Sequence, residues 1–307
     1  MSTTHAARGP LAAMALGAAL ISTSAVFVEW VRIGPTASAF WRMGLAAVLL
    51  LAWLQRPAVR AGWRPAPRVL ALVAVAAVFF ALDLWMWHRS ILYAGVGLAT
   101  LLGNFQVFLM ALAGFLIYRE RLGWPFLVGV ALAFVGLYLL VGLDWGGVGA
   151  QYHLGVALGI ATGVCYAAYM LSTRHAQRAG HVRLAPAQLL CVSTLLCALV
   201  LGVATLLEGD SFALPDAQSW SALLGLGFFG QVLGWVLLTR AMPQLPASLI
   251  GLLLLLQPAL SFLFDVILFA RPTRALDWIG VGLSLLGIFI GSYRRPAPAA
   301  EPVSDSA

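Results

Sequence analysis

Residues 97–118 read GLATLLGNFQVFLMALAGFLIY, and residues 248–269 read SLIGLLLLLQPALSFLFDVILF. Each stretch is apolar and long enough to cross the hydrocarbon core of a bilayer as a helix, which takes about 20 residues at about 1.5 Å each. A shift of 151 positions lays the first stretch on the second without a gap and brings Gln106 onto Gln257. Two apolar stretches that repeat each other in this way indicate a duplicated fold.

The same shift aligns the neighbouring apolar stretches as well. Matched leucines mean little in so apolar a chain, whereas matched arginines, glutamines and spaced glycines are informative. The informative pairs are Arg89 with Arg240, Gln106 with Gln257, Gly129 with Gly280, and Gly136 with Gly287. At a different offset, Leu16-Gly17 matches Leu154-Gly155. The repeat therefore extends over most of the chain.

Composition places the chain in a membrane. Of its 307 residues, 62% are hydrophobic and 9% are charged, whereas soluble domains average about 45–50% and about 25%. Ten apolar stretches, separated by polar, glycine or proline residues, are predicted to be transmembrane helices. They are Leu11–Val28, Thr36–Leu54, Val69–Leu92, Gly97–Tyr118, Trp124–Leu143, Leu154–Thr173, Pro186–Leu207, Ser219–Thr239, Ala247–Ala270 and Ala275–Tyr293.

The predicted fold is an all-α integral membrane protein with ten transmembrane helices, arranged as two inverted five-helix repeats. Because five is odd, the second half must cross the membrane in the opposite sense from the first. We assign residues 1–147 to the first repeat, 148–295 to the second, and 296–307 to a disordered cytoplasmic tail. Inverted repeats are typical of secondary transporters, whose halves rock about a site near the midplane.

Arginine counts predict the orientation. All 18 cationic side chains are arginines, and with a cytoplasmic N-terminus 13 of them fall at the cytoplasmic end against 4 at the other. Cytoplasmic loops carry such an excess of positive charge, and an even helix number returns the C-terminus to the cytoplasm. We therefore expect a multi-pass protein of the bacterial cytoplasmic (inner) membrane with both termini cytoplasmic.

Three segments carry a resemblance to a known family. They are Pro35-Thr-Ala-Ser-Ala-Phe-Trp-Arg42, then Gly97-Leu-Ala-Thr-Leu-Leu-Gly-Asn-Phe-Gln106 running on to Arg119-Glu120-Arg121-Leu122, and Pro246-Ala-Ser-Leu-Ile-Gly-Leu-Leu-Leu-Leu-Leu-Gln-Pro258. With its length, helix number and duplication, the chain resembles the EamA-type transporters of the drug/metabolite transporter superfamily. It departs from their pattern at Val107, where a proline is common, and at Arg271, where an acid is common. The resemblance implies a central cavity and, mostly, efflux of amino acids or other metabolites.

Polar side chains inside the predicted helices are the candidates for a substrate site. Amides near the bilayer midplane need hydrogen-bond partners, which are either substrate groups or neighbouring helices. Aromatic residues with polar groups suit a cavity for a semi-polar organic molecule, although packing between helices is the alternative for each of them. The substrate-binding candidates are Gln106, Gln257, Asn104, Gln231, Trp235, Tyr166, Tyr169, Asp83 and Trp87.

Arg42, His88 and Asp265 are assigned structural or coupling roles. Arg42 and Asp83 are charged inside predicted helices, where a charge costs roughly 2.5–3.5 kcal/mol, and both fall at a similar depth. Two interpretations stay open for them: an ion pair that fixes helix packing, or an anchor for a charged substrate. His88 and Asp265, in the outer parts of their helices, are candidates for proton coupling.

The predicted function is a secondary transporter of small metabolites, most consistent with efflux of amino acids or related compounds by alternating access. The expected partners are a small-molecule substrate and the lipid bilayer, with protons as the candidate coupling ion. A flippase for lipids or lipid-linked sugars with the same fold is the alternative. An intramembrane enzyme is disfavoured, because the chain lacks HExxH and GxSxG motifs and paired intramembrane aspartates.

Neither a cofactor nor nucleic acid is expected. Cys165, Cys191 and Cys197 lie inside apolar stretches without the spacing of metal ligands, so we expect no metal site. The arginines sit in short gaps between helices and form no basic stripe with interleaved aromatic residues, which excludes a nucleic-acid partner from our expectation.

Overall fold

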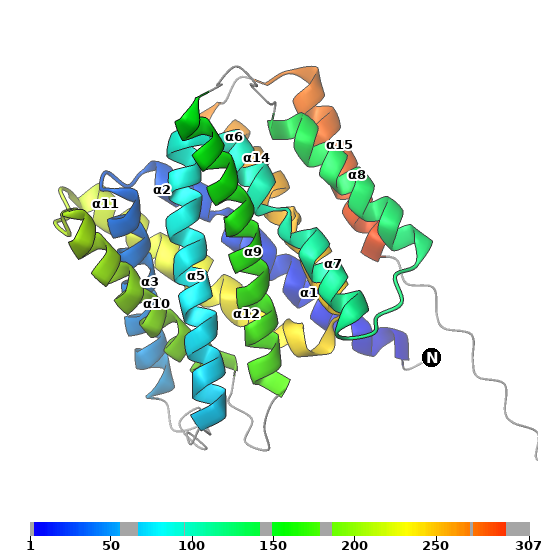
Figure 1. Cartoon of the computed structure of the whole chain (residues 1–307), viewed down its shortest axis with the longest axis horizontal. Coiled ribbons are helices and arrows are strands. Elements are labelled where there is room, and N and C mark those ends of the chain that lie inside the picture. Colours follow the sequence, from blue (N-terminus) through cyan, green and yellow to red (C-terminus); the bar gives the residue numbers. More distant parts are fainter. Residues whose placement is uncertain are drawn as a thin grey trace, which may run out of the picture.

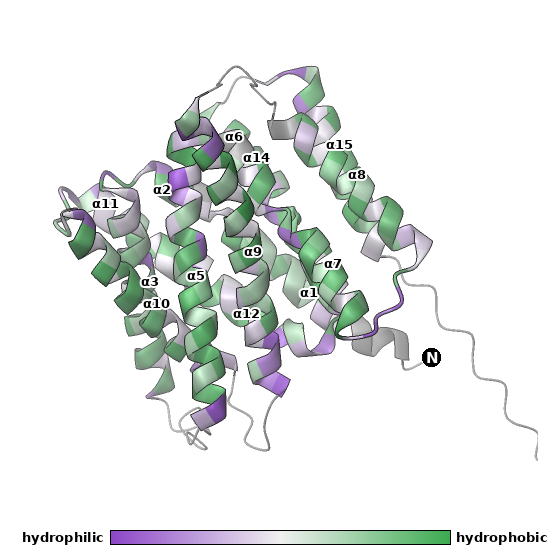
Figure 2. Cartoon of the chain, viewed as in Figure 1, coloured by the Kyte–Doolittle hydropathy of each residue, from purple (hydrophilic) through white to green (hydrophobic). Residues whose placement is uncertain are grey.

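The computed structural model describes residues 3–55, 67–94, 96–141, 149–178, 186–270 and 273–292, and the regular elements in this part of the chain are all helices. They form a bundle in which the hydrophobic residues follow the helices and the hydrophilic ones concentrate toward the helix ends (Figures 1 and 2). The predicted tail at 296–307 and the predicted boundary between residues 147 and 148 lie outside the described residues, so the division at that boundary stays a proposal.

The first half contains seven described helices. They are α1 (Thr3–Ser22), α2 (Ser24–Glu29), α3 (Pro35–Leu54), α5 (Pro67–Ala94), α6 (Val96–Gly103), α7 (Gln106–Leu116) and α8 (Trp124–Val141). The helices of the second half are α9 (Ala150–Arg178), α10 (Pro186–Glu208), α11 (Ala217–Gly225), the π-helical η1 (Leu226–Gly234), α12 (Trp235–Ala241), the short η2 (Met242–Gln244), α13 (Ala247–Leu254), α14 (Leu256–Phe269) and α15 (Ala275–Ser292). Several predicted spans therefore consist of two or more shorter helices in line.

Membrane-spanning capacity agrees with the predicted ten helices. Among the described residues, nine helical stretches are long and apolar enough to cross a bilayer, and Trp124–Leu139 is a shorter apolar helix that fills the remaining place. We call the end with residues 30–34 and 209–216 the outer end, and the end with residues 117–123 and 242–246 the inner end. The fold is an all-α membrane protein of two five-helix repeats, as expected.

One predicted helix boundary was wrong in a way that matters. The sixth span was expected to end at Thr173, with Arg174 in the following loop, but α9 continues to Arg178. Arg174 is consequently only 2% exposed. The positive charge made the residue look like a loop residue, although its aliphatic stem and a carboxylate partner allow it to stay in the helix.

Helix breaks occur at equivalent positions in the two halves. α6 ends at Gly103 and α7 begins at Gln106, while α13 ends at Leu254 and α14 begins at Leu256. In the second half, Pro258 has no amide hydrogen to donate to the carbonyl of Leu254, which explains the break. In the first half, the side chain of Asn104 donates to Thr100 O at 2.8 Å instead, a local bond that competes with the helix.

The helix ends repeat in the same way. Arg119 and Ala270 both adopt a left-handed backbone, with φ of 52° and 49°, and the 151-residue shift places one on the other. Residues with a Cβ enter this region only when surrounding structure holds them there. The duplication is therefore visible in the backbone even where the side chains have diverged.

The two repeats meet reciprocally at α8 and α15, which run side by side at one flank of the bundle (Figure 1). Gly129 of α8 lies against Gly287 of α15, and Gly136 lies against Gly280. Because Gly129 and Gly136 are the repeat equivalents of Gly280 and Gly287, each contact is the counterpart of the other. Such exchange is the signature of a two-fold axis between like surfaces.

Candidate functional site

Aromatic side chains from both halves gather in the bundle interior. The ring of Phe80 in α5 stacks on Tyr169 of α9, with centroids 4.3 Å apart and 7° between the planes. Trp235, the first residue of α12, packs edge-on against both, at 5.2 Å and 5.0 Å, and lies 6.3 Å from Tyr166. Phe80, Tyr166, Tyr169 and Trp235 form what we call the aromatic cluster, and three of the four were predicted site residues.

Several buried polar atoms of the predicted site residues have no hydrogen-bond partner among the described residues. They include Nε1 of Trp235, both amide atoms of Gln231, Oε1 of Gln106 and Nε of Arg42. A buried polar atom without a partner costs about 1–3 kcal/mol, so native proteins keep few of them. These atoms are therefore available to a ligand.

The backbone is irregular around Gln231, in the segment that leads into Trp235. The residues of η1 form a π-helix, in contrast to the repeat-equivalent residues of α5, which are α-helical. π-helical turns are rare and frequent at functional sites, because they redirect side chains at the expense of regular hydrogen bonding. Gln231 is fully buried, and its amide therefore faces protein groups rather than lipid.

Gln106 and Gln257, the pair matched by the repeat, approach the same stretch of α9. The Gln257 amide donates to the hydroxyl of Tyr166 at 3.4 Å, a long bond. The backbone nitrogen of Gln106 lies beside Gly163, where a side chain on that residue would touch it. Both glutamines sit at the start of the second segment of a broken helix, the arrangement that many transporters use for binding.

Arg42 of α3 and Asp83 of α5 lie close enough to influence each other electrostatically, and Arg42 is also an electrostatic neighbour of Tyr166 and Tyr169. The ion pairs within 4.0 Å in the described part of the chain do not include Arg42 with Asp83. Asp83 is only 7% exposed. The two residues thus lie beside the aromatic cluster without an ion pair within 4.0 Å between them, so both interpretations from the sequence stay open.

The remaining predicted residues lie farther toward the outer end or are occupied locally. Asn104, in the break between α6 and α7, donates to Thr100 O of α6, and His88 contacts the Leu84 carbonyl through Nδ1 at 2.7 Å. Trp87 packs edge-on against His88 and lies near Gly103. The side chain of Asp265 falls outside the described residues, so its predicted coupling role stays a prediction.

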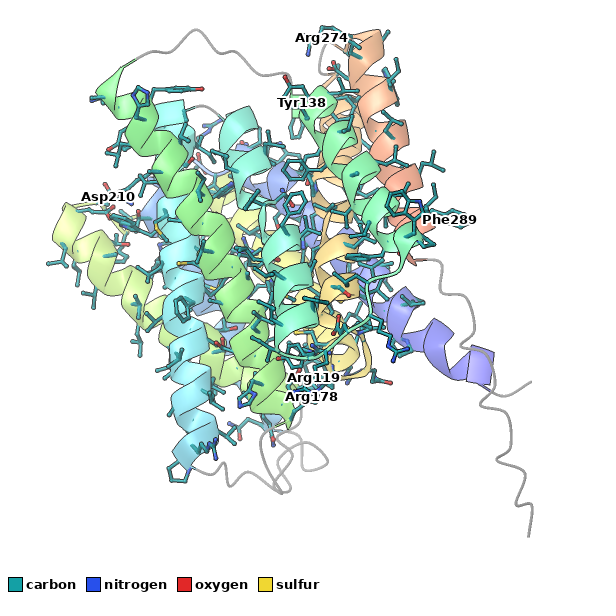
Figure 3. All side chains as sticks on the ribbon, turned by 45° about the vertical axis from the view of Figure 1, so that its right-hand side comes forward. Arg119, Tyr138, Arg178, Asp210, Arg274 and Phe289 are labelled. Carbon is teal, nitrogen blue, oxygen red and sulfur yellow. The ribbon has the colours of Figure 1, made fainter. Side chains whose placement is uncertain are left out.

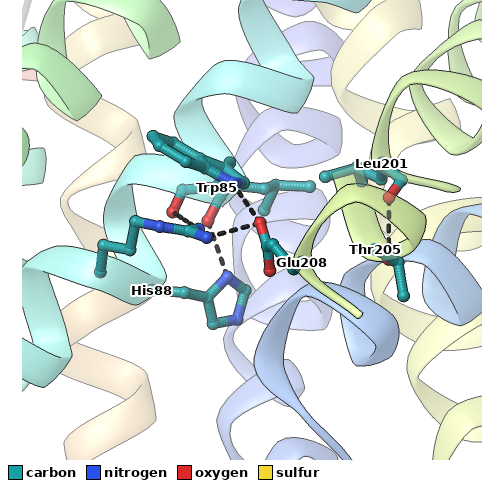
Figure 4. Close-up of polar contacts among 7 residues, drawn as sticks. Trp85, His88, Leu201, Thr205 and Glu208 are labelled. Atoms are coloured by element: carbon teal, nitrogen blue, oxygen red, sulfur yellow. Dashed lines mark hydrogen bonds and ion pairs between the residues drawn. The ribbon is translucent and has the colours of Figure 1, made fainter. Parts of the chain in front are cut away.

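The outer end is held by contacts between the halves that the sequence did not predict (Figure 4). Glu208, the last residue of α10, accepts hydrogen bonds from Trp85 Nε1 at 2.7 Å and from Arg89 at 2.5 Å. The Arg89 guanidinium also lies 3.6 Å from the centroid of the Trp85 ring. A second ion pair joins Arg32 to Asp216 at 3.3 Å.

The inner end is held by Glu120, which follows α7 in the first half and contacts the start of α13 in the second. Its carboxylate accepts hydrogen bonds from the amides of Ala247 and Ser248 at 2.6 and 3.1 Å, and from the Ser248 hydroxyl at 2.7 Å. Arg174 lies 3.6 Å away. Sequence reasoning missed Glu120 because, between two loop arginines, it resembled an ordinary solvated charge.

Comparison with known proteins identifies relatives at the level of family and fold. The profile of the EamA-like transporter family matches residues 9–142 and again residues 153–293. A known crystal structure, described only as that of a protein, aligns with a TM-score of 0.76 and 19% identity, over 92% of this chain and 96% of the other. No curated protein matches the chain. The structural match concerns the fold alone.

Proposed function

Since the chain belongs to the EamA-like transporter family, we propose that it exports amino acids or closely related small metabolites across the bacterial cytoplasmic membrane. The family makes it a membrane transporter of the drug/metabolite type. The substrate class, the direction and the alternating-access mechanism are our proposal. The argument for them rests on the interior site and on the contacts at its two ends.

The observation that carries the proposal is that Arg42 and Asp83 lie beside the aromatic cluster without an ion pair within 4.0 Å between them. Opposite charges in a membrane interior stabilise each other best when they pair, because unpaired charges there are costly. A zwitterionic amino acid supplies a carboxylate for Arg42 and an ammonium group for Asp83. Its side chain would then meet the aromatic cluster, which suits apolar and aromatic groups.

Alternating access requires that the contacts at the two ends break in turn. The contacts of Glu208 with Arg89 and Trp85 join the halves at the outer end, and those of Glu120 with α13 join them at the inner end. Each consists of few polar interactions at the edge of the bundle. We propose that the halves rock about the α8–α15 contact, with one set of contacts open at a time.

The proposal is tested with purified protein in proteoliposomes loaded with one unlabelled amino acid at a time. Labelled amino acid outside should exchange into the vesicles faster than into protein-free vesicles for at least one zwitterionic amino acid. Repeating the assay with an imposed pH difference tests protons as the coupling ion. Failure of all zwitterionic amino acids, together with transport of a lipid-linked sugar, would establish the flippase alternative instead.

Gln106→Leu and Gln257→Leu are expected to weaken substrate affinity about five- to thirtyfold. Each replacement removes a hydrogen bond worth about 1–2 kcal/mol while nearly preserving side-chain volume. The measurement is the concentration dependence of exchange at matched protein levels, and the matched control is Gln151→Leu on the exposed face of α9. Unchanged affinity in both variants would remove the glutamines from the binding site.

The proposed orientation predicts the outcome of reporter fusions. A fusion after Arg64 should report a cytoplasmic location, and a fusion after Gly147 a periplasmic one, because an odd number of spans separates the two positions. Alkaline phosphatase and a fluorescent protein, which are active on opposite sides of the inner membrane, give complementary readouts. The same compartment for both fusions would contradict the orientation.

A further inference from the structure

The start of α13 carries the donors of a carboxylate-binding site. The amides of Ala247 and Ser248 and the Ser248 hydroxyl all point at one carboxylate, that of Glu120. The N-terminus of a helix favours negative charge, because its first amides are free and the peptide dipoles align there. All three donors belong to the second half of the chain, whereas the carboxylate comes from the first.

Arg174 also belongs to this site, and two of its guanidinium nitrogens have no hydrogen-bond partner in the described part of the chain. Its guanidinium donates to the carbonyl of Leu245 at 2.7 Å and lies 4.2 Å from the centroid of the Tyr118 ring. Its Nε and one terminal nitrogen are buried, without a hydrogen-bond partner in the described part of the chain. That terminal nitrogen is 3.6 Å from Glu120, beyond hydrogen-bond distance. Arg174 therefore retains capacity for a second anionic oxygen.

A recess of about 310 Å³ opens beside these donors, which is enough for a small metabolite. Its lining holds two arginines against one glutamate, so its net charge favours an anion. The recess lies at the inner end, where Figure 3 also shows Arg119 and Arg178, away from Asp210 and Arg274 at the outer end. The lining residues are Tyr118, Glu120, Arg174, Arg178, Gln244, Leu245 and Pro246.

Glu120 reaches the site from a tight turn and not from a helix. The left-handed backbone of Arg119 reverses the chain, and the amide of Glu120 donates to Gly114 O at 2.8 Å. A Cβ on Gly114 would stand 2.5 Å from the Glu120 carboxylate, so the glycine provides the space. The carboxylate is thus a tethered group that can leave without unfolding a helix.

We infer that the start of α13, with Ser248 and Arg174, is a carboxylate-binding subsite for the transported substrate at the inner end, which Glu120 occupies in this conformation. The inference rests on the proposed function for the identity of the ligand. A substrate carboxylate that replaces Glu120 breaks the contact between the halves at this end. Arrival of the substrate therefore unlocks the inner end, and its departure allows Glu120 to return.

The test is chemical rescue of Glu120→Ala in phosphatidylcholine nanodiscs, read by hydrogen–deuterium exchange of the amides at 247 and 248. Removal of the carboxylate should raise their exchange roughly tenfold or more, because both amides lose their acceptor. Acetate should restore protection in a saturable manner, whereas acetamide, its neutral isostere, should not. The second substitution Ser248→Ala or Arg174→Gln should weaken the rescue, and Glu29→Ala, at the outer end, should change neither amide.

Wild-type exchange in Glu120→Ala, or equal rescue by acetate and acetamide, would overturn the inference. If Glu120→Ala does not fold, Glu120→Gln serves instead, and acetate should then raise its thermal midpoint but not that of the wild type. Protection by phosphatidylglycerol without any response to acetate would assign the site to a lipid headgroup and also overturn it. The rescue experiment measures no transport. Rescue by acetate without amino-acid exchange in proteoliposomes would therefore contradict the proposed function and leave the carboxylate-binding site in place.

Discussion

Gly287→Ala will leave little folded protein. A methyl group on Gly287 would stand 2.5 Å from the carbonyl oxygen of Gly129 and closer still to the backbone nitrogen of Ala133. Both obstacles are backbone atoms of α8, so no side chain can move aside, and the helices must separate. We expect a loss of about 3 kcal/mol, the upper part of the range for overpacked interiors. The measurement is the monodisperse fraction and thermal midpoint of a fluorescent fusion in detergent.

Gly282→Ala is the matched control for this prediction. It lies on the same helix, and apart from the local backbone of that helix nothing lies within 4 Å of the position that its Cβ would occupy. Alanine also favours the helix over glycine by about 0.8–1.0 kcal/mol, so this variant should be as stable as the wild type or more so. Equal folded yields from Gly282→Ala and Gly287→Ala would show that α8 and α15 do not pack through their glycines.

The equivalent contact of Gly136 with Gly280 provides a second test. If the two contacts are related by the repeat, Gly136→Ala, the counterpart of Gly287→Ala, should be about as damaging, since a methyl on Gly136 would meet the carbonyl oxygen of Gly280 and the backbone nitrogen of Ser284. Loss of the α8–α15 contact should impair the rocking of the halves as well as their assembly. A variant that folds but exchanges no substrate would therefore support this contact as the pivot.

The features that could be predicted from sequence are those that residue type and spacing show without any knowledge of packing. Apolar length predicts a span, and a repeated glutamine or a glycine pair survives as a match at fixed distance, as Gln106 and Gln257 do. The spans, the duplication and three members of the aromatic cluster followed from such signals. Phe80 did not, because a phenylalanine in an apolar stretch is indistinguishable from ordinary packing.

Contacts between distant segments were the part that sequence could not supply. Glu120 and Ser248 are far apart in the chain and unremarkable in their own segments, so their bond appears only once α7 and α13 are side by side. The π-helical η1 was also missed, although its three glycines at 227, 230 and 234, with Gly225 directly before it, were a weak signal of irregular backbone. Both features depend on packing, which overrides local preference.

Asp83→Asn and Arg42→Gln are expected to have the largest effects on transport. A charge-assisted hydrogen bond contributes about 1.5–3 kcal/mol, so each change should raise the half-saturation concentration for an amino acid roughly 10- to 150-fold. The two substitutions should differ in which substrate analogues they affect. Asp83→Asn should spare the deaminated acid, which lacks the ammonium group, and Arg42→Gln should spare the amino amide, which lacks the carboxylate.

The competing interpretation, that Arg42 and Asp83 pair to fix helix packing, predicts a different pattern. Removal of one partner of a buried pair costs about 3–5 kcal/mol, because the other charge is left alone. Arg42→Ala and Asp83→Ala would then each lower the folded yield, and the exchanged pair Arg42→Asp with Asp83→Arg would recover part of it. A substrate anchor cannot be recovered by exchange in this way, since the substrate would meet each charge on the wrong helix. Recovery of folded yield with no analogue-specific change in affinity would therefore remove both residues from the site, and leave the aromatic cluster and the glutamines to bind a less polar molecule.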